Sequence, residues 1–417
     1  MPFRIGLSGL SAAQADLKIT GNNIANVGTI GFKQSRAEFA DVYATSKFGS
    51  VSTAIGSGVR LAASAQQFTQ GNIIFTENNL DLGITGEGFF TMDDVSGNRV
   101  YTRNGQFKVD KDGFIVDNSG SNLKGYGVDP ISNAIDTGNI TNLQLSNTSI
   151  DPLATSTAEI FANLDASSPM IANGTTIDSA DPTTYTHTTA FTAYDSLGNP
   201  LTVAMYFQKY NDGNTPPTDN LWRLGIEYTD ALGGTNDNFA APDTVTFSPT
   251  GALTSASTIN FSATPTTGAT TPQPVTYTLT GLTQFGADFG VTNLTQNGYT
   301  TGQLSGLDVD QSGVITARFT NGQSNNLGQV ILTGFTNNQG LSQLGDNYWA
   351  ESFSSGAGVI NTPGAGNLGL INSGALEDSN VNLTEQLINL ITAQRNFQAN
   401  AKTITTADTI TQTLIQI

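Results

Sequence analysis

Residues 383–404 read Leu383-Thr-Glu-Gln-Leu-Ile-Asn-Leu-Ile-Thr-Ala-Gln-Arg-Asn-Phe-Gln-Ala-Asn-Ala-Lys-Thr-Ile404, the most regular stretch of the 417-residue chain. Apolar residues recur in it at alternating spacings of four and three, the heptad pattern of a coiled-coil helix. Asn382 followed by Glu385 indicates a capping box at the helix start, with Ser379 as an alternative N-cap. Neither Gly nor Pro occurs in residues 377–416, so a helix of roughly 50–60 Å is predicted.

The first 27 residues carry the same spacing, with Gln14 and Gly21 as two poor members and Gly28 as the expected stop. The two stripes are Phe3, Leu7, Leu10, Gln14, Leu17, Gly21 and Ile24 near the start, and Leu383, Leu387, Leu390, Gln394, Phe397, Ala401 and Ile404 near the end. Apolar seams of this kind must be buried, and one possibility is that each helix packs on the β-part of its own chain. Because heptads occur at both ends and not between them, we expect the helices to pair with each other and with further copies.

Between the helices, almost all of the chain reads as strand and turn. Dipeptides such as Asn104-Gly105 and Asp112-Gly113 separate short runs of β-forming residues. From about Asp151 to Gly281 the chain is Thr-rich, acidic and nearly free of basic residues, which indicates an inserted all-β domain.

The predicted fold is multidomain and mainly β, with two all-β domains, one nested in the other, and N- and C-terminal α-helices that form a coiled-coil domain. The predicted boundaries are 1–33 and 370–417 for the helical domain, 34–70 and 357–369 for linkers, 71–150 and 284–356 for the inner β-domain, and 151–283 for the outer β-domain.

Charge is scarce in this chain and mostly acidic. Asp, Glu, Lys and Arg make up 12% of the residues and the net charge is −18, whereas an average protein has roughly 25% charged residues. A nucleic-acid-binding protein needs a basic face, and no Lys or Arg occurs between Lys124 and Lys209. No apolar run approaches the ~18 residues of a membrane span. We therefore predict neither a nucleic-acid partner nor membrane insertion.

Motifs for catalysis and metal binding fail in the sequence. The chain has no Cys and one His, His187, which excludes disulfides, Cys-based zinc sites and Cys nucleophiles. Asp308 begins a stretch like a calcium loop, but Phe319 stands where the bidentate Glu belongs. Residues 364–369 match G-x-G-x-x-G in a loop rather than between a strand and a helix. We predict no catalytic residue, no metal, no cofactor and no enzymatic activity.

Three blocks in a fixed order carry a family resemblance. They are Gly9-Leu-Ser-Ala-Ala-Gln-Ala-Asp16, Gly21-Asn-Asn-Ile-Ala-Asn26 and Gly31-Phe-Lys33; then Phe68-Thr-Gln-Gly71, Leu80-Asp-Leu-Gly-Ile-Thr-Gly-Glu-Gly-Phe-Phe90 and Thr102-Arg-Asn-Gly-Gln-Phe107; then Ser373-Gly-Ala-Leu-Glu-Asp-Ser-Asn-Val-Asn-Leu383 and Gln394-Arg-Asn-Phe-Gln-Ala-Asn-Ala-Lys402. Together they resemble the bacterial flagellar rod–hook axial proteins. Gly83 departs from the Ala of the family pattern.

The size of the chain and its inserted domain resemble the hook members of that family. The resemblance implies a structural subunit that self-assembles into a curved, flexible tube, a universal joint that transmits torque from rod to filament and encloses the export channel. The implied partners are further copies, the distal rod protein, the hook cap, the hook–filament junction protein and the flagellar export apparatus. The alternatives are a distal-rod-type basal-body protein and a secreted β-rich adhesin or enzyme that shares the terminal helices.

The implied location is the extracellular flagellum. The start of the chain imitates a signal peptide, but its stretch 5–12 is interrupted by Gly and Ser, so we expect export without a cleaved signal. From the seams and the resemblance, assembly contacts between copies are predicted at Leu7, Leu10, Leu17, Asn22, Asn23, Ile24, Asn26, Leu383, Leu387, Leu390, Phe397 and Ile404.

Overall fold

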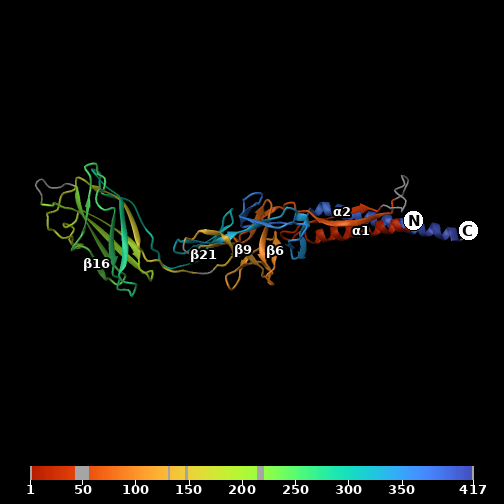
Figure 1. Cartoon of the computed structure of the whole chain (residues 1–417), viewed down its shortest axis with the longest axis horizontal. Helices are drawn as coiled ribbons and strands as arrows, with labels where there is room; N and C mark the ends of the chain where they lie inside the picture. Colours follow the sequence, from red (N-terminus) through yellow and green to blue (C-terminus); the bar gives the residue numbers. More distant parts are fainter. Residues whose placement is uncertain (1, 43–55, 130–131, 146–148, 214–219, 416–417) are drawn as a thin grey trace. The chain divides into compact units, whose positions relative to one another are not determined.

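The computed structural model describes residues 2–42, 56–129, 132–145, 149–213 and 220–415. It is mainly β-sheet with a long helix near each end of the chain, which confirms the predicted fold class (Figure 1). The chain divides into two compact units. Unit 1 comprises Met1–Asn147, Gly306–Arg318 and Ser324–Ile417, and unit 2 comprises Thr148–Ser305 and Phe319–Gln323. Unit 2 is therefore an insertion into unit 1.

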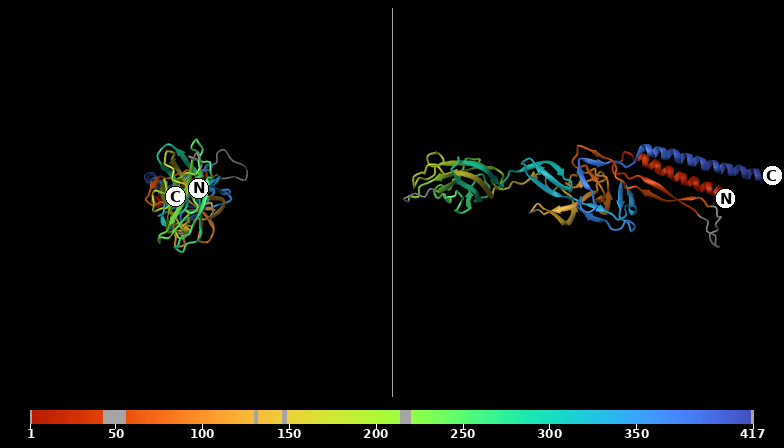
Figure 2. Two further views of the ribbon diagram at one scale, coloured as in Figure 1. Left: turned by 90° about the vertical axis from the view of Figure 1, so that its left-hand side faces the viewer. Right: turned by 90° about the horizontal axis from the view of Figure 1, so that it is seen from above.

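The helices α1 (Pro2–Ala25) and α2 (Leu383–Ile415) lie side by side and run antiparallel, so the start of α1 and the end of α2 lie at the same end of the pair (Figures 1 and 2). The side chain of Asn382 caps α2, since its Oδ1 accepts hydrogen bonds from the N–H groups of Thr384 and Glu385 at 3.0 and 3.3 Å. Asn382, rather than Ser379, is the N-cap. At 1.5 Å per residue the 33 residues of α2 extend about 50 Å.

The β-part of unit 1 is built around one large antiparallel sheet. Strand β9 pairs with β5, β10 and β23, and β5 pairs with β6 and β24. The pairs β28–β4 and β29–β3 join the segment before α2 to the first strands of the sheet region. The bounds are β3 (Ile73–Phe75), β4 (Leu82–Thr85), β5 (Phe89–Asp93), β6 (Arg99–Thr102), β7 (Lys108–Val109), β8 (Ile115–Val116), β9 (Asn122–Val128), β10 (Ile135–Asn142), β23 (Ser324–Val330), β24 (Leu332–Gly334), a 3-10 turn (Asn338–Gly340), β25 (Ser342–Gly345), β26 (Tyr348–Ala350), β27 (Val359–Asn361), β28 (Leu370–Ser373) and β29 (Ala375–Glu377).

Unit 2 contains two sheets. One has the order β18-β19-β12-β20 and the other the order β13-β14-β15-β16, with β17 also on β15. The bounds are β11 (Ser149–Ile150), β12 (Thr157–Asp165), β13 (His187–Tyr194), β14 (Pro200–Lys209), β15 (Leu221–Thr229), β16 (Thr235–Asp237), β17 (Asp243–Thr246), β18 (Thr258–Ala263), β19 (Gln273–Phe285) and β20 (Gly290–Gln296). Strands β21 (Gly302–Val309) and β22 (Val314–Phe319) contain residues of both units.

One turn pattern, Asp-x-x-Gly, recurs in both units. The Asp Oδ1 accepts the N–H groups two and four residues later, and the Gly has a φ between 82° and 85°. Only Gly adopts this left-handed conformation without strain. Five described turns of this kind begin at Asp94, Asp110, Asp117, Asp195 and Asp230. The many Asp and Gly residues of the chain therefore close hairpins.

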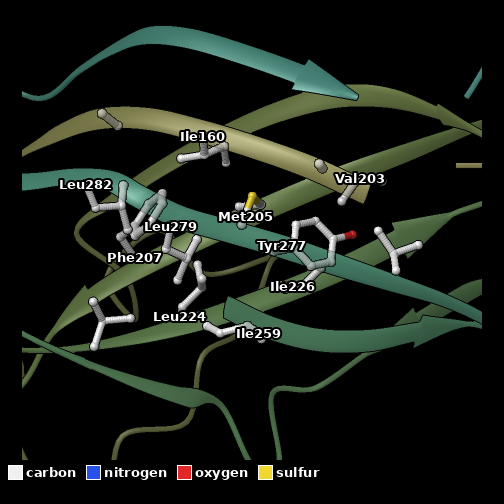
Figure 3. Packing of buried hydrophobic residues seen from close by; sticks show 14 of the residues in the cluster. Ile160, Val203, Met205, Phe207, Leu224, Ile226, Ile259, Tyr277, Leu279 and Leu282 are labelled. Carbon is white, nitrogen blue, oxygen red and sulfur yellow. The ribbon is translucent and has the colours of Figure 1, made fainter. Parts of the chain in front are cut away.

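Each unit has its own hydrophobic core. In unit 2, apolar side chains from the two sheets face one another, with Leu224, Ile226 and Leu279 fully buried (Figure 3). In unit 1, Leu82, Phe90, Met92 and Leu332 belong to the main core. A separate aromatic cluster of unit 1 consists of Phe89, Tyr101 and Trp349, with Phe68 and Phe335 packed against it.

Several predicted segments differ from the structure. The expected linker 357–369 contains β27, and the expected helical segment 370–417 begins with β28 and β29, which pair with β4 and β3. The expected linker 34–70 contains the antiparallel pair β1 (Ser35–Asp41) and β2 (Val59–Gln66), and its residues 43–55 lie outside the described part of the chain. Residues 284–305, assigned to the inner β-domain, belong to unit 2, because β20 pairs with β12 there. Strand β12 was not expected from the sequence. Because β20 is placed in unit 2 by its pairing with β12, the sequence alone could not assign β20 to that unit.

Truncation of Leu224 tests the separate core of unit 2. We expect Leu224→Ala to lower the free energy of unfolding of unit 2 by about 2–5 kcal/mol, because a fully buried Leu leaves a cavity. The melting transition of unit 1 is expected to stay in place. Differential scanning calorimetry of the full chain measures both transitions. Leu232→Ala is the control, since Leu232 is 73% exposed, and a shift of both transitions by Leu224→Ala would contradict two independent cores.

Candidate assembly interface

The contact between α1 and α2 is lined on the α1 side by small residues. Gly6, Ala13 and Thr20 are buried at seven-residue intervals. A Cβ at Gly6 would come within 2.9 Å of Ile404 Cγ1, and a Cβ at Gly9 within 2.4 Å of Asn400 Oδ1. The distance between packed helices depends on the side chains at the contact. The missing side chains therefore let α2 approach α1 closely.

The predicted seam of α1 is divided, because Leu10, Leu17 and Ile24 follow the buried residues by four positions and share their face, whereas Leu7 lies beside it. Phe3 and Leu7 are 50% and 55% exposed, and Leu10, Leu17 and Ile24 are half-buried. Periodicity finds the leucines because they are apolar, but the closest approach to α2 occurs at Gly6 and Gly9, one position before Leu7 and Leu10. A stripe of Gly and Ala at heptad spacing was the signal that could have located it. Of the large apolar side chains of α1, Phe3, Ile5 and Leu7 thus remain exposed on its surface.

The predicted residues of α2 divide into two groups. Leu390, Phe397 and Ile404 are half-buried and share the helix face of the buried Gln386 and Ala393. Leu383 and Leu387 are each 44% exposed and lie outside this face. Ile388 and Ile391, which are 59% and 51% exposed, add to the apolar surface of the first turns of α2.

The predicted asparagines mostly organise the base of the helix pair within one chain. Asn23 is buried, exchanges hydrogen bonds of 2.8 and 2.9 Å with the backbone of Ser35, and donates to Gln386 Oε1 at 3.2 Å. Asn26 donates from Nδ2 to the carbonyl of Asn22 at 2.9 Å and so helps to terminate α1. Asn22 itself is exposed. A contact of these residues with another copy stays a prediction.

A buried group of charges lies just below the helix pair. Lys33 Nζ donates to Glu377 Oε1 at 2.6 Å, and Arg103 donates from its guanidinium to Glu377 Oε2 at 3.0 Å. The side chains of Lys33 and Glu377 are fully buried, and that of Arg103 is 5% exposed. Glu377 Oε1 also accepts the N–H of Gly71 at 2.9 Å, and Lys33 donates to the carbonyl of Thr69 at 2.8 Å. We call Lys33, Arg103 and Glu377 the charge cluster.

The charge cluster joins segments that are far apart in the sequence. Burial lowers the pKa of Lys33 and of Arg103, and the carboxylate of Glu377 opposes this shift. Sequence reasoning missed these residues, although all three lie in blocks that carry the family resemblance. Because the chain has few charged residues, a single charged residue within a Gly-rich or apolar stretch could have indicated a buried ion pair.

His187 in unit 2 takes part in packing. Its ring stacks on Phe289 with centroids 4.5 Å apart, and its Nε2 lies 3.1 Å from Ser168 Oγ. Ser168 Oγ donates to the Asp165 carboxylate at 3.3 Å. Burial lowers the pKa of His187, and Asp165 acts in the opposite direction. In a catalytic triad the carboxylate accepts a hydrogen bond from the imidazole and orients it. Here the carboxylate of Asp165 accepts hydrogen bonds from Ser167 and Ser168 instead.

The two loop motifs adopt turns. Asp310 Oδ1 accepts the N–H of Val314 at 2.9 Å, and Asp308 pairs with Arg318 at 2.7 Å. Gly364 and Gly369 share a backbone hydrogen bond, and β28 follows them in place of a helix. Among the residues that the structure describes, no group of three His, Asp or Glu side chains could hold a metal ion. Within the same residues, no helix combines the length and hydropathy needed to cross a membrane.

Four segments of the chain match models of flagellar protein families. Residues 3–33 match "Flagella basal body rod protein" and residues 83–156 match "Flagellar hook protein FlgE/F/G D1 domain". Residues 163–299 match "Flagellar basal body protein FlaE D2 domain", and residues 372–417 match "Flagellar basal body rod FlgEFG protein C-terminal". The matches cover both helices and most of both units.

Whole proteins and one solved structure are similar as well. The chain is 37% identical to flagellar hook protein FlgE of Escherichia coli over the full length of both, and 33% identical to flagellar hook protein FlgE of Treponema pallidum over 99% of this chain and 98% of that protein. The chain shares its fold with the crystal structure of Helicobacter pylori flagellar hook protein FlgE2. The TM-score is 0.56 and the sequence identity 14%, over 73% of this chain and all of that chain.

Removal of the carboxylate of Glu377 tests the charge cluster. We expect Glu377→Gln to destabilise unit 1 by about 3–5 kcal/mol, because it leaves two buried cations without a counter-charge. Thermal unfolding of unit 1 in the full chain measures the loss. Glu38→Gln is the control: its pair with Arg36 is exposed, so a change below about 1 kcal/mol is expected. Equal effects of both substitutions would contradict a structural role for the cluster.

Enlargement of Gly9 tests the close approach of the helices. We expect Gly9→Leu to separate α1 from α2, since even a Cβ would meet the side chain of Asn400. Hydrogen exchange of α1 amides is expected to accelerate. Gly21→Ala is the matched control, because its Cβ would meet nothing within 4 Å, and better helix propensity should stabilise α1 by about 0.5–1 kcal/mol. Unchanged protection of α1 in Gly9→Leu would contradict the contact.

Proposed function

The chain belongs to the family of bacterial flagellar hook proteins and is a structural subunit of the flagellar hook, and from this premise we propose that its copies form a tube whose innermost wall is built from α1–α2 pairs. The observation that carries the proposal is the set of large apolar side chains that stay exposed on the two helices within one chain. The close contact within one chain uses the small residues of α1, so large apolar side chains stay exposed on both helices. They are Phe3, Ile5, Leu7, Leu383, Leu387, Ile388 and Ile391.

Contact with further copies gives these side chains a place to be buried. Apolar surface removed from water contributes about 25 cal/mol per Å², and a tube repeats the contact at every subunit. The predicted contacts Leu7, Leu10, Leu17, Leu383 and Leu387 would then lie between copies. Leu390, Phe397 and Ile404 would support them by holding α2 against α1.

We infer the role in transmitting torque from how the helix pair is joined to the β-units. The charge cluster and the bonds of Asn23 couple the helix pair to the inner β-strands of unit 1, so torque applied to the helices would pass to that unit. Polar surfaces with few charges would let the β-units of neighbouring copies slide as the tube bends. In this role the chain is a structural element rather than an enzyme, and the tube encloses the export channel.

The further partners and the route out of the cell follow from the family resemblance. They are the distal rod protein, the hook cap, the hook–filament junction protein and the export apparatus, and the chain would leave the cell with its N-terminus uncleaved. A distal-rod-type role or an adhesin role is less favoured, because the relatives that match over the whole length are hook proteins.

A charge in the exposed seam tests the proposal. We expect Leu7→Asp to abolish tubes, because a carboxylate would be buried without a partner at several kcal/mol in every copy. The melting of the monomer should stay within about 0.5 kcal/mol, since Leu7 is 55% exposed in one chain. Electron microscopy of the polymerised protein and motility of cells measure the outcome. Ser11→Asp, an exposed polar position off the leucine stripe, is the milder control.

Normal tubes from Leu7→Asp would show that the α1 seam does not lie between copies. Loss of the monomer fold in Leu7→Asp would show that this residue is buried within the chain instead.

A further inference from the structure

The chain contains four Asn-Gly sequences, and in this dipeptide the Asn side chain is open to attack by its own backbone. The backbone nitrogen of the following residue can bond to Cγ of the Asn side chain, and Gly has no side chain to hinder the approach. The structure distinguishes the four pairs by how firmly each Asn amide and each Gly is held. The pairs are Asn104-Gly105, Asn173-Gly174, Asn297-Gly298 and Asn321-Gly322.

In three of the pairs, the side-chain oxygen of Asn accepts backbone hydrogen bonds. Asn104 Oδ1 accepts the N–H of Gln106 at 3.1 Å, and Asn321 Oδ1 accepts that of Gln323 at 3.1 Å. Asn297 Oδ1 accepts two backbone N–H groups, both at 3.0 Å. The amide must leave these bonds to turn its Cγ toward the Gly nitrogen, so they oppose the reaction.

Two glycines of these three pairs are also packed against neighbouring segments. Gly105 and Gly298 are buried. A Cβ built on Gly105 would lie 1.7 Å from the carbonyl oxygen of Leu82, and one built on Gly298 would lie 2.1 Å from Thr155 Oγ1. The backbone therefore has little room to move at these two positions.

The fourth pair, Asn173-Gly174, lies in an exposed turn of unit 2. The N–H of Thr175 donates to the carbonyl of Ala172 at 3.3 Å across the turn, and Gly174 has a φ of 84°. A Cβ built on Gly174 would meet nothing within 4 Å. The side chain of Asn173 donates from Nδ2 to the carbonyl of Asp212 at 3.3 Å. Within the described ranges of the chain, no group donates a hydrogen bond to Asn173 Oδ1.

We propose that Asn173 is a site of spontaneous deamidation. The Gly174 nitrogen loses its proton to water and bonds to Cγ of Asn173, and Nδ2 takes a proton from water and leaves as ammonia. The product of this step is a five-membered succinimide ring. Water then adds to one of the two ring carbonyls and opens the ring to aspartate or isoaspartate. The net change is the replacement of an amide by a carboxylate, with one water consumed and one ammonia released.

The reaction changes the turn in two ways. The new carboxylate no longer donates to the carbonyl of Asp212 and adds a negative charge beside this acidic residue. Isoaspartate also lengthens the main chain by one methylene, next to Ile171, whose N–H and C=O bond to Lys209 and Asn211. Because water does not reverse the loss of ammonia, the modified fraction records the age of the subunit. The inference does not depend on the proposed function, since the reaction needs neither an enzyme nor assembly.

Incubation of the folded full chain at neutral pH tests the site. Peptide mapping by mass spectrometry follows all four pairs, and methylation by an isoaspartyl methyltransferase identifies isoaspartate. We expect Asn173 to convert at least about tenfold faster than the other three, because those react only after local opening. The variant Asn173→Gln keeps the amide but would require a six-membered ring. It should remove the isoaspartate signal of this peptide and leave the melting of unit 2 in place.

The same chain unfolded in urea is the matched control. Without the folded structure, the four pairs should convert within about threefold of one another. Equal rates at the four pairs in the folded chain would overturn the inference. It would also be overturned if Asn173 stayed intact in the folded chain while the unfolded chain converted.

Discussion

One carboxylate shared by two buried cations holds the two ends of the chain to the inner β-strands. Glu377 lies 344 residues from Lys33 and 274 residues from Arg103 along the sequence. An isolated buried ion costs several kcal/mol, so the three side chains are stable there only together. Their contacts with Thr69 and Gly71 bring in a further segment. The group thus connects the segment after α1, the segment before α2 and the strands of unit 1.

Different residues of α1 serve its contact with α2 and its proposed contact with further copies. Gly6 and Gly9 give a close contact inside the chain, and Phe3, Ile5 and Leu7 stay exposed. Large side chains at Gly6 and Gly9 would hold α2 farther from α1. The same logic places Leu390, Phe397 and Ile404 of α2 inward and leaves Leu383 and Leu387 exposed.

The sequence predicted the elements that depend on local physics. Heptad spacing and the cap at Asn382 located α2, and runs of β-forming residues located β6, β21 and β22. It did not predict that α2 approaches α1 most closely at Gly6 and Gly9, because periodicity weighs apolar side chains and gives these two residues no weight. It also missed the pairing of Glu377 with Lys33 and Arg103, since no local pattern connects residues so distant in the chain. Strand β12 was missed although it alternates buried and half-buried residues, because its place between β19 and β20 is set by partners more than a hundred residues away.

The strands at the entrance and exit of unit 2 are hydrogen-bonded neighbours, since Ser149 pairs with Gln303 and Ile150 with Gly302. The chain therefore leaves this unit beside the point where it entered. A segment with adjoining ends behaves as a cassette: a larger, smaller or differently decorated domain can occupy the same position without changing the path of the remaining chain. A change in the size of this unit is thereby separated from the helix pair, because neither the entry nor the exit of the chain has to move.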